Sequence, residues 1–148
     1  MLNINQVELG NVIFAKNFKG ERVERRLVGG AYGECVKWFL VDAETMELKS
    51  HTRETKEEVL EGFEIQAIVS YDLQEKGTVC KDINEYELGD LFYIIREGEL
   101  TARMVVGGTA YDDTVYFAID PHTGKRVSRT KTSIEEVLDC YDIEFILK

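Results

Sequence analysis

The sequence is poor in the residues that build cross-links, metal sites and membrane spans. Its 148 residues include three cysteines, two histidines, one proline and no apolar run near the roughly 18 residues of a membrane span. Cys35, Cys80 and Cys140 are odd in number and lack a C-x-x-C pair, which excludes a disulfide framework and a cysteine zinc site. The amino-terminal residues have neither the basic start nor the apolar stretch of a signal peptide. We therefore expect a cytoplasmic protein without a membrane partner.

Positive charge is also scarce. The chain has 18 Lys and Arg against 28 Asp and Glu, a formal net charge of -10. Binding to nucleic-acid phosphates needs a positive surface, so no direct nucleic-acid binding is expected. A composition that is 44% hydrophobic and 31% charged is that of a folded domain rather than a disordered chain.

Motifs of catalysis and metal binding are missing as well. The sequence has no G-x-S-x-G, no H-E-x-x-H and no calcium loop of alternating Asp residues. Gly29-Gly30-x-x-Gly33 has no Gly-Lys-Ser/Thr after it, so it predicts a turn or bulge rather than a phosphate loop. We predict no catalytic residue, no metal and no cofactor, and so a protein that is not an enzyme. A site assembled in space around His51 or His122 stays open as the enzymatic alternative.

What the chain does contain is an internal repeat. Residues 4–11 recur as 83–90, and residues 28–69 match 106–147 at an offset of 78, with 14 of 42 positions identical. This predicts a duplication whose two copies form a pseudo-twofold pair. The expected organisation is a first repeat at 1–70, a connector at 71–82 that could form a hairpin, and a second repeat at 83–148.

The two copies together predict the secondary structure. Apolar segments 12–15 and 36–41, with their partners 91–95 and 114–119, are typical of strands, and 126–130 predicts a further strand after a turn. Thr55-x-x-Glu58 and Ser133-x-x-Glu136 are capping boxes that predict helix starts, each before a last strand. The expected unit is β-β-β-β-α-β, an α+β fold with mostly antiparallel sheets.

Acidic residues gather on the predicted helices, away from the apolar stripe. This face is the candidate surface for a basic protein partner, and ordinary solvation of a helix is the alternative interpretation. The six candidate residues are Glu57, Glu58, Glu61, Glu135, Glu136 and Asp139.

Residues 117–124 (F-A-I-D-P-H-T-G) and 132–141 (T-S-I-E-E-V-L-D-C-Y) carry a resemblance. They resemble small uncharacterised α+β repeat proteins of phages and mobile elements of low-GC Gram-positive bacteria, in which a D-x-x-T-G hairpin precedes an S-x-E-E-V-L helix. The resemblance covers about forty residues per copy and contains no catalytic motif, so it transfers no site. It implies a phage-type inhibitor, in the cytoplasm of a bacterial host, of a nucleic-acid-binding defence effector, as an anti-CRISPR protein inhibits Cas9.

A third hypothesis concerns small molecules. The aromatic residues Trp38, Tyr111 and Tyr116 could line a pocket between the two copies. The protein would then be a scaffold or a small-molecule-binding protein.

Overall fold

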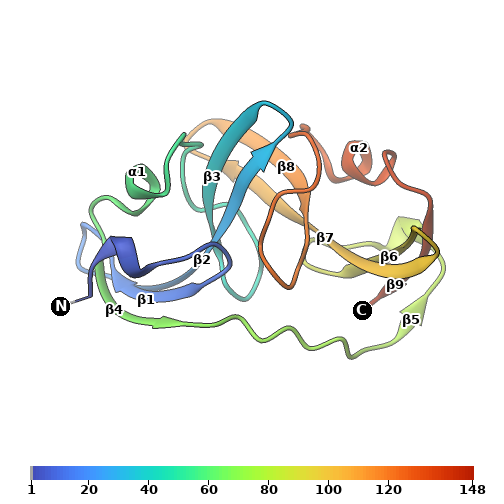
Figure 1. Cartoon of the computed structure of the whole chain (residues 1–148), viewed down its shortest axis with the longest axis horizontal. Coiled ribbons are helices and arrows are strands. Elements are labelled where there is room, and N and C mark those ends of the chain that lie inside the picture. The colour runs from blue at the N-terminus through green and yellow to red at the C-terminus, as the bar shows by residue number, and fades with distance from the viewer. Residues whose placement is uncertain (1) are drawn as a thin grey trace.

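The computed structural model describes residues 2–148 and consists mainly of β-strands (Figure 1). Strands make up 46% of it and helical segments 11%, and the strands form two antiparallel sheets. The prediction of an α+β fold is therefore wrong, because neither half has enough helix to form a layer against its sheet.

The first half forms a four-stranded sheet in the order β3-β2-β1-β4. Long β2 pairs with β1 through its first part and with β3 through its second, and β4 returns beside β1. The elements are η1 (Ile4–Gln6), β1 (Val12–Lys16), β2 (Arg22–Tyr32), β3 (Cys35–Asp42), α1 (Lys56–Leu60) and β4 (Glu64–Val69).

The second half repeats this order of elements and adds one strand, giving the sheet order β5-β9-β6-β7-β8. The extra strand is β5 (Val79–Cys80), which pairs with β9. The other elements are η2 (Ile83–Glu85), β6 (Leu91–Arg96), β7 (Glu99–Ala110), β8 (Asp113–Ile119), α2 (Ile134–Leu138) and β9 (Ile143–Leu147).

Each helix begins where the sequence predicts and ends much sooner. The hydroxyls of Thr55 and Ser133 accept the amides of Glu58 and Glu136, so both capping residues act as expected. α1 and α2 are nevertheless only five residues long. The apolar spacing of Ile134, Val137, Leu138 and Tyr141 at i, i+3, i+4 and i+7 predicts a helix that continues to Tyr141, which lies beyond the end of α2.

The strand expected at 126–130 does not form. In its place are isolated bridges, because the Ser128 hydroxyl accepts the Ala118 amide at 2.8 Å where a ladder would use a backbone carbonyl. Ser50 accepts the Leu40 amide in the same way in the first half. In both halves, therefore, a serine hydroxyl replaces a backbone carbonyl as the acceptor for one strand amide.

The two halves hold each other through reciprocal turns. The Gly29 amide donates to the Gly124 carbonyl at 3.1 Å, and the Arg126 amide donates to the Gly29 carbonyl at 2.8 Å. The Gly107 amide donates to the Met46 carbonyl at 3.2 Å, and the Leu48 amide donates to the Gly107 carbonyl at 2.8 Å. The two pairs of bonds are equivalent, since their residues differ by the repeat offset of 78. Each half therefore contributes a turn that bonds to a glycine of the other half. We call this arrangement the reciprocal turn contact.

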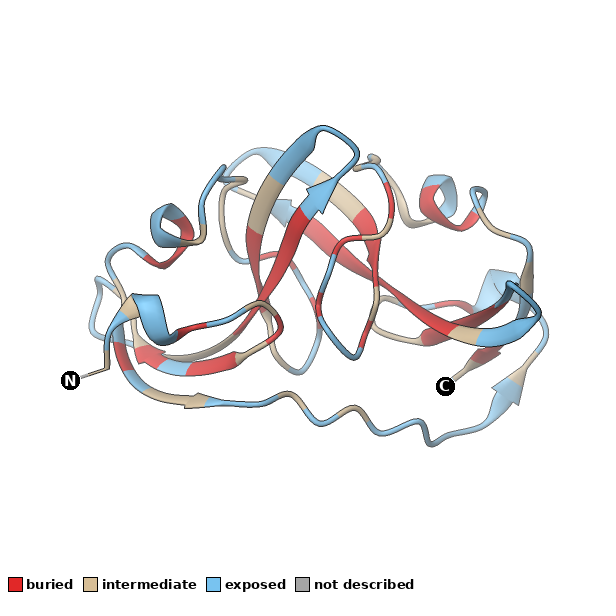
Figure 2. Ribbon diagram, viewed as in Figure 1, coloured by how far each residue is buried: buried red, intermediate tan, exposed pale blue. Residues whose placement is uncertain are grey.

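Buried apolar side chains form three clusters, shown by the red segments in Figure 2. One cluster lies within each half, and the third is shared where β2, β3, β7 and β8 cross. At its centre the rings of Phe39 and Phe117 lie 4.5 Å apart. The halves are therefore held together by a shared apolar core as well as by the reciprocal turn contact.

The segment between the halves runs extended along one side of the molecule (Figure 1). Its first residue, Tyr71, places its ring 3.7 Å from the Arg26 guanidinium carbon. Its later part becomes β5 and pairs Val79 with Leu147 and Cys80 with Ile146. The connector therefore contacts both halves.

Candidate functional site

The six acidic candidates lie on α1 and α2 or directly after them, and all six are exposed. In Figure 1 both helices lie on the same side of the molecule, one on each side of the β2–β3 hairpin. The structure therefore gathers three acids at each of two places rather than six at one.

Two of the six carboxylates already have partners. Glu58 accepts the Thr55 hydroxyl at 2.9 Å, and Glu136 accepts the Thr132 hydroxyl at 2.5 Å. Thr55 is the capping residue of α1, and Thr132 precedes the capping residue Ser133 of α2, so neither bond is the one to a cap's backbone amide that would complete a capping box. The acids left for a partner are therefore Glu57, Glu61, Glu135 and Asp139.

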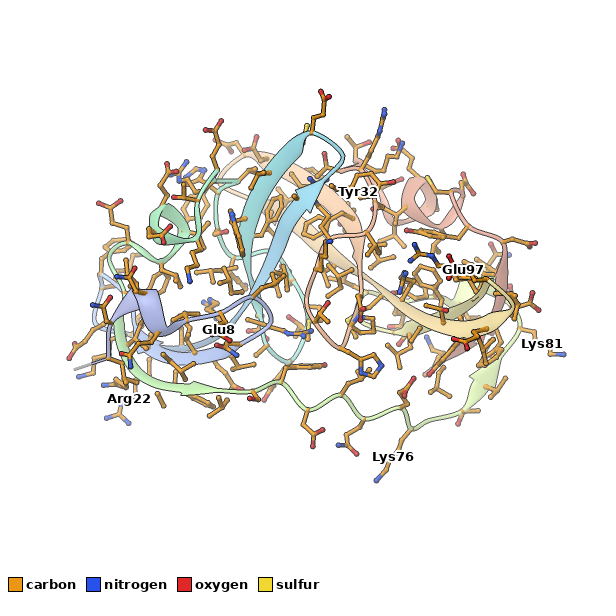
Figure 3. All side chains as sticks on the ribbon, in the orientation of Figure 1. Glu8, Arg22, Tyr32, Lys76, Lys81 and Glu97 are labelled. Atoms are coloured by element: carbon orange, nitrogen blue, oxygen red, sulfur yellow. The ribbon has the colours of Figure 1, made fainter. Side chains whose placement is uncertain are left out.

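The basic residues are distributed differently from the acidic ones. Arg26, Arg103 and Arg126 are buried, whereas each of the 28 carboxylates is at least partly exposed. Subtracting these three from the 18 basic residues leaves 15 against 28, so the surface has a formal charge of -13. Arg22, Lys76 and Lys81 point outward at the edge of the molecule in Figure 3, and Glu8 and Glu97 are exposed as well.

Arg26 contributes to the contact between halves. Its Nε donates to the Gly10 carbonyl at 2.9 Å and its Nη2 to the Pro121 carbonyl at 2.9 Å. Burial lowers its pKa to about 10, opposed by the nearby Tyr71 and Asp120. Its partners come from both halves, so we assign it a structural role.

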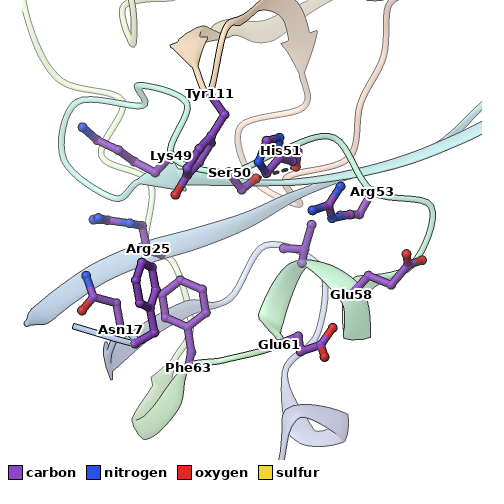
Figure 4. Close-up of a pocket in the computed structure, with 12 residues that line it drawn as sticks. Asn17, Arg25, Lys49, Ser50, His51, Arg53, Glu58, Glu61, Phe63 and Tyr111 are labelled. Atoms are coloured by element: carbon purple, nitrogen blue, oxygen red, sulfur yellow. Dashed lines mark hydrogen bonds between the residues drawn. The ribbon is translucent and has the colours of Figure 1, made fainter. Parts of the chain in front are cut away.

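A cleft of about 210 Å³ lies in the first half beneath the tip of the β7–β8 hairpin (Figure 4). We call it the first cleft. Tyr111 reaches into it and stacks on His51, with ring centroids 4.2 Å apart. Arg25, Lys49 and Arg53 line it together with Glu58 and Glu61. Of these cations Arg25 has an acidic partner, with its Nη1 3.7 Å from the Asp42 Oδ2.

A second cleft of about 570 Å³ lies at the matching place in the second half, beneath the β2–β3 hairpin. Tyr32, labelled in Figure 3 at the end of β2, takes part in its wall. The cleft is also lined by Arg96, Arg103, Lys125 and Arg126, with Asp120 as its single acidic lining residue in residues 2–148. We call this the second cleft.

Sequence reasoning missed Arg103. The repeat contained the signal, because Arg103 stands 78 residues after Arg25 and precedes an apolar run. Arg126 opens the segment 126–130 that the sequence predicts as a strand, and its side chain is only 2% exposed.

The aromatic residues expected to share a pocket do not do so. Tyr111 lines the first cleft, Trp38 lines a separate hollow near Glu8, and Tyr116 packs against the core of the second half. A pocket lined jointly by Trp38, Tyr111 and Tyr116 is thus absent from the described structure.

Neither histidine is placed as a general base for a nucleophile. Beside His51, the Ser50 hydroxyl donates to the His51 carbonyl at 2.9 Å, the contact dashed in Figure 4. His122 has its Nε2 4.0 Å from the Glu75 Oε2. Within residues 2–148, no group of three or more His, Cys, Asp or Glu could hold a metal ion.

The chain matches no protein-family model, no curated protein and no solved structure. The helices of the described residues are all too short or too polar to cross a membrane.

Proposed function

We propose that this protein is a non-enzymatic binding protein whose acidic surface engages a partner rich in basic side chains. The observation that supports it most is the burial of Arg26, Arg103 and Arg126 while all carboxylates reach solvent. Folding makes the surface more negative than the sequence, at -13 rather than -10. The long-range field follows the full net charge of -10, because buried arginines still contribute to it, and it speeds encounter with cationic partners and repels anionic ones.

The helix acids are the part of this surface that we assign to the partner. Glu57, Glu61, Glu135 and Asp139 are exposed, and no ion pair joins them to a cation in the part of the chain that the structure describes. Because α1 and α2 lie on one side of the molecule, one partner can touch both (Figure 1).

The narrower proposal is a phage-type inhibitor of a host nucleic-acid-binding defence effector, with Cas9 as the example. Such an effector holds phosphates with Arg and Lys side chains, and carboxylates presented on a rigid surface compete for those side chains. The resemblance of residues 117–141 to phage proteins supports this choice of partner.

The test is a charge reversal that spares the caps. Purified protein should form a salt-sensitive complex with guide-loaded Cas9 and reduce its binding to target DNA. The quadruple variant Glu57→Lys, Glu61→Lys, Glu135→Lys and Asp139→Lys should weaken the complex by about a hundredfold or more, because several charge pairs are lost together.

The matched control changes the net charge equally at exposed acids away from the helices: Glu44→Lys, Asp72→Lys, Glu99→Lys and Glu144→Lys. It should retain most of the binding. Equal loss in both variants would show that only net charge matters and would refute the helix surface. Absence of any complex would refute Cas9 as the partner.

A further inference from the structure

The second cleft concentrates positive charge on an otherwise acidic surface. Together with the adjoining hollow of about 620 Å³ that shares Tyr32 and Arg126, it is lined by a third of the chain's cations and by two acids, Glu34 and Asp120. A concave site of one charge focuses the field and attracts the opposite charge. The six cations are Lys37, Arg96, Arg103, Lys125, Arg126 and Arg129.

Two of these arginines are buried with donors left open. Arg103 is 5% exposed, and its one side-chain hydrogen bond within residues 2–148 is from Nη1 to the Ala102 carbonyl at 3.0 Å. Arg126 donates to the carbonyls of Ser128 and Cys35, but its buried Nε has no partner. The free donors of Arg103 are not buried, so an anion in the cleft can reach them, whereas the buried and unpaired Nε of Arg126 is unfavourable for the folded state.

The first cleft shows how the repeat satisfies the same arginine internally. There β3 extends to Asp42, which lies opposite Arg25 in the ladder, and the Ala43 amide donates to the Glu24 carbonyl at 3.4 Å. In the second half the residue equivalent to Ala43 is Pro121, which has no amide hydrogen to donate.

The ladder of the second half accordingly ends one residue earlier. β8 stops at Ile119, before Asp120, and no ion pair joins Arg103 to a carboxylate in the described residues. Asp120 therefore does not pair with Arg103 in the way that Asp42 pairs with Arg25.

We propose that the second cleft binds a small phosphorylated molecule, with its phosphate group held by Arg103, Arg126 and Lys125. Guanidinium groups bind phosphate oxygens through paired hydrogen bonds, which favours a phosphate over a halide. The rings of Tyr32 and Tyr141, which also line the cleft, offer an apolar surface to the organic part. The cleft has the volume of a typical small-molecule site.

The surrounding charge favours a small ligand over a nucleic acid. A polyanion would have to lie along a molecule of net charge -10, whereas a single phosphate group enters the basic cleft alone. This site does not depend on the acidic helix faces and goes beyond the function proposed for them.

The experiment is isothermal titration calorimetry of the full chain at low ionic strength with inorganic phosphate, phenyl phosphate and a single-stranded oligonucleotide. Both phosphates should bind at one site, with phenyl phosphate tighter because its ring meets the tyrosines. Arg103→Met should weaken binding by about tenfold or more, since one charged hydrogen-bonding partner is lost. Arg25→Met, the matched change in the first cleft, should alter it less than about twofold, because Arg25 lies outside the second cleft.

Lys125→Gln repeats the test at an exposed position where folding is not at risk, and it should also weaken phosphate binding severalfold. No saturable binding of either phosphate would overturn the proposal. Equal weakening by Arg25→Met would show a general charge effect and overturn it too. Tighter binding of the oligonucleotide would identify a nucleic-acid site instead. None of these outcomes depends on Cas9 binding.

Discussion

The two clefts stand at equivalent places in the two halves and differ in how their charge is balanced. In the first, Arg25 faces Asp42, and two helix glutamates line the walls. In the second, Arg103 has no carboxylate partner in residues 2–148, and four cations and one acid line the walls, against three cations (Arg25, Lys49 and Arg53) and two acids in the first. A single proline accounts for much of this, because it shortens one ladder by a residue. The same backbone, repeated in the two halves, can thus form a neutral cleft or one that attracts anions, depending on the length of one strand.

The hydrogen bonds between the halves are symmetric, but the packing around them is not. Substitution of two equivalent glycines should give the largest difference in stability between the halves. Gly10 and Gly89 are equivalent and have φ of +89° and +88°. A Cβ at Gly10 would lie 2.3 Å from the Thr123 carbonyl oxygen, whereas at Gly89 the nearest atom would be 3.5 Å away. Gly89→Ala should cost about 1–2 kcal/mol from backbone strain alone. Gly10→Ala should cost about 1–3 kcal/mol more through overlap.

Urea unfolding of the two variants measures this difference directly. Each variant is the control for the other, because the backbone strain is the same. Equal losses of stability would mean that the turn at 120–126 shifts freely, and that the asymmetry of the contact has no energetic weight.

The two halves also differ in their buried tyrosines, whose hydroxyl groups can ionise. Tyr86, Tyr93 and Tyr141 are wholly or largely buried in the second half, where the first half has Val7, Phe14 and Phe63. Burial raises the pKa of Tyr93 to about 12, helped by its hydrogen bond to Glu75, and raises the pKa of Tyr141 to about 12. Burial raises the pKa of Tyr86 further still.

These tyrosines contribute stability that is complete below pH 10 and lost as the pH rises from 10 towards 12, because the unfolded phenols ionise first. The loss is at most about 1.4 kcal/mol per pH unit for each tyrosine. Arg26, whose pKa is lowered to about 10, and Arg126, whose pKa burial also lowers, act in the opposite direction but are two groups against three.

The double variant Tyr93→Phe and Tyr141→Phe should therefore move alkaline unfolding to higher pH. Circular dichroism and phenolate absorbance recorded together across the titration measure it. Ionisation of the phenols near pH 10 without loss of structure would contradict the prediction.

The smallest expected change in stability comes from Pro121→Ala, which gives the second half the residue type of the first. The new amide can donate to the Ala102 carbonyl and extend the ladder, bringing Asp120 opposite Arg103. Stability should change by less than about 1 kcal/mol, because the added bond offsets the greater freedom of the unfolded chain. Phosphate binding should fall severalfold, because Asp120 then neutralises Arg103. Calorimetry that shows unchanged affinity would disprove this account of the difference between the clefts.

The sequence predicts the strands well and the helices poorly, for local reasons. The segments at 12–15 and 36–41 lie within β1 and β3, because short runs rich in Val, Ile and aromatic residues favour strands over helices. The capping boxes mark both helix starts, but nothing in the caps limits a helix to five residues. The expected strand at 126–130 failed because Ser128 replaces a backbone acceptor, which periodicity does not reveal.

The candidate sites were harder to predict than the strands. The acidic helix residues are exposed as expected, and the structure adds that Glu58 and Glu136 have cap partners. The second cleft combines Arg103 and Arg126 of the second half with Tyr32 of the first, which reaches it only through the contact between halves. The arginines stand out because they lack carboxylate partners in the described residues. A sequence lists the charged residues but does not show which of them are left unpaired in the fold.

The reciprocal turn contact also bears on how such a molecule can vary. Each half carries both the turn that is given and the glycine that receives it, so one half alone has a self-complementary face, as the subunit of a twofold homodimer has. In a homodimer every substitution appears in both sites at once. Joining the two halves in one polypeptide removes that restriction, and Pro121 is a change that only a fused pair can carry on one side.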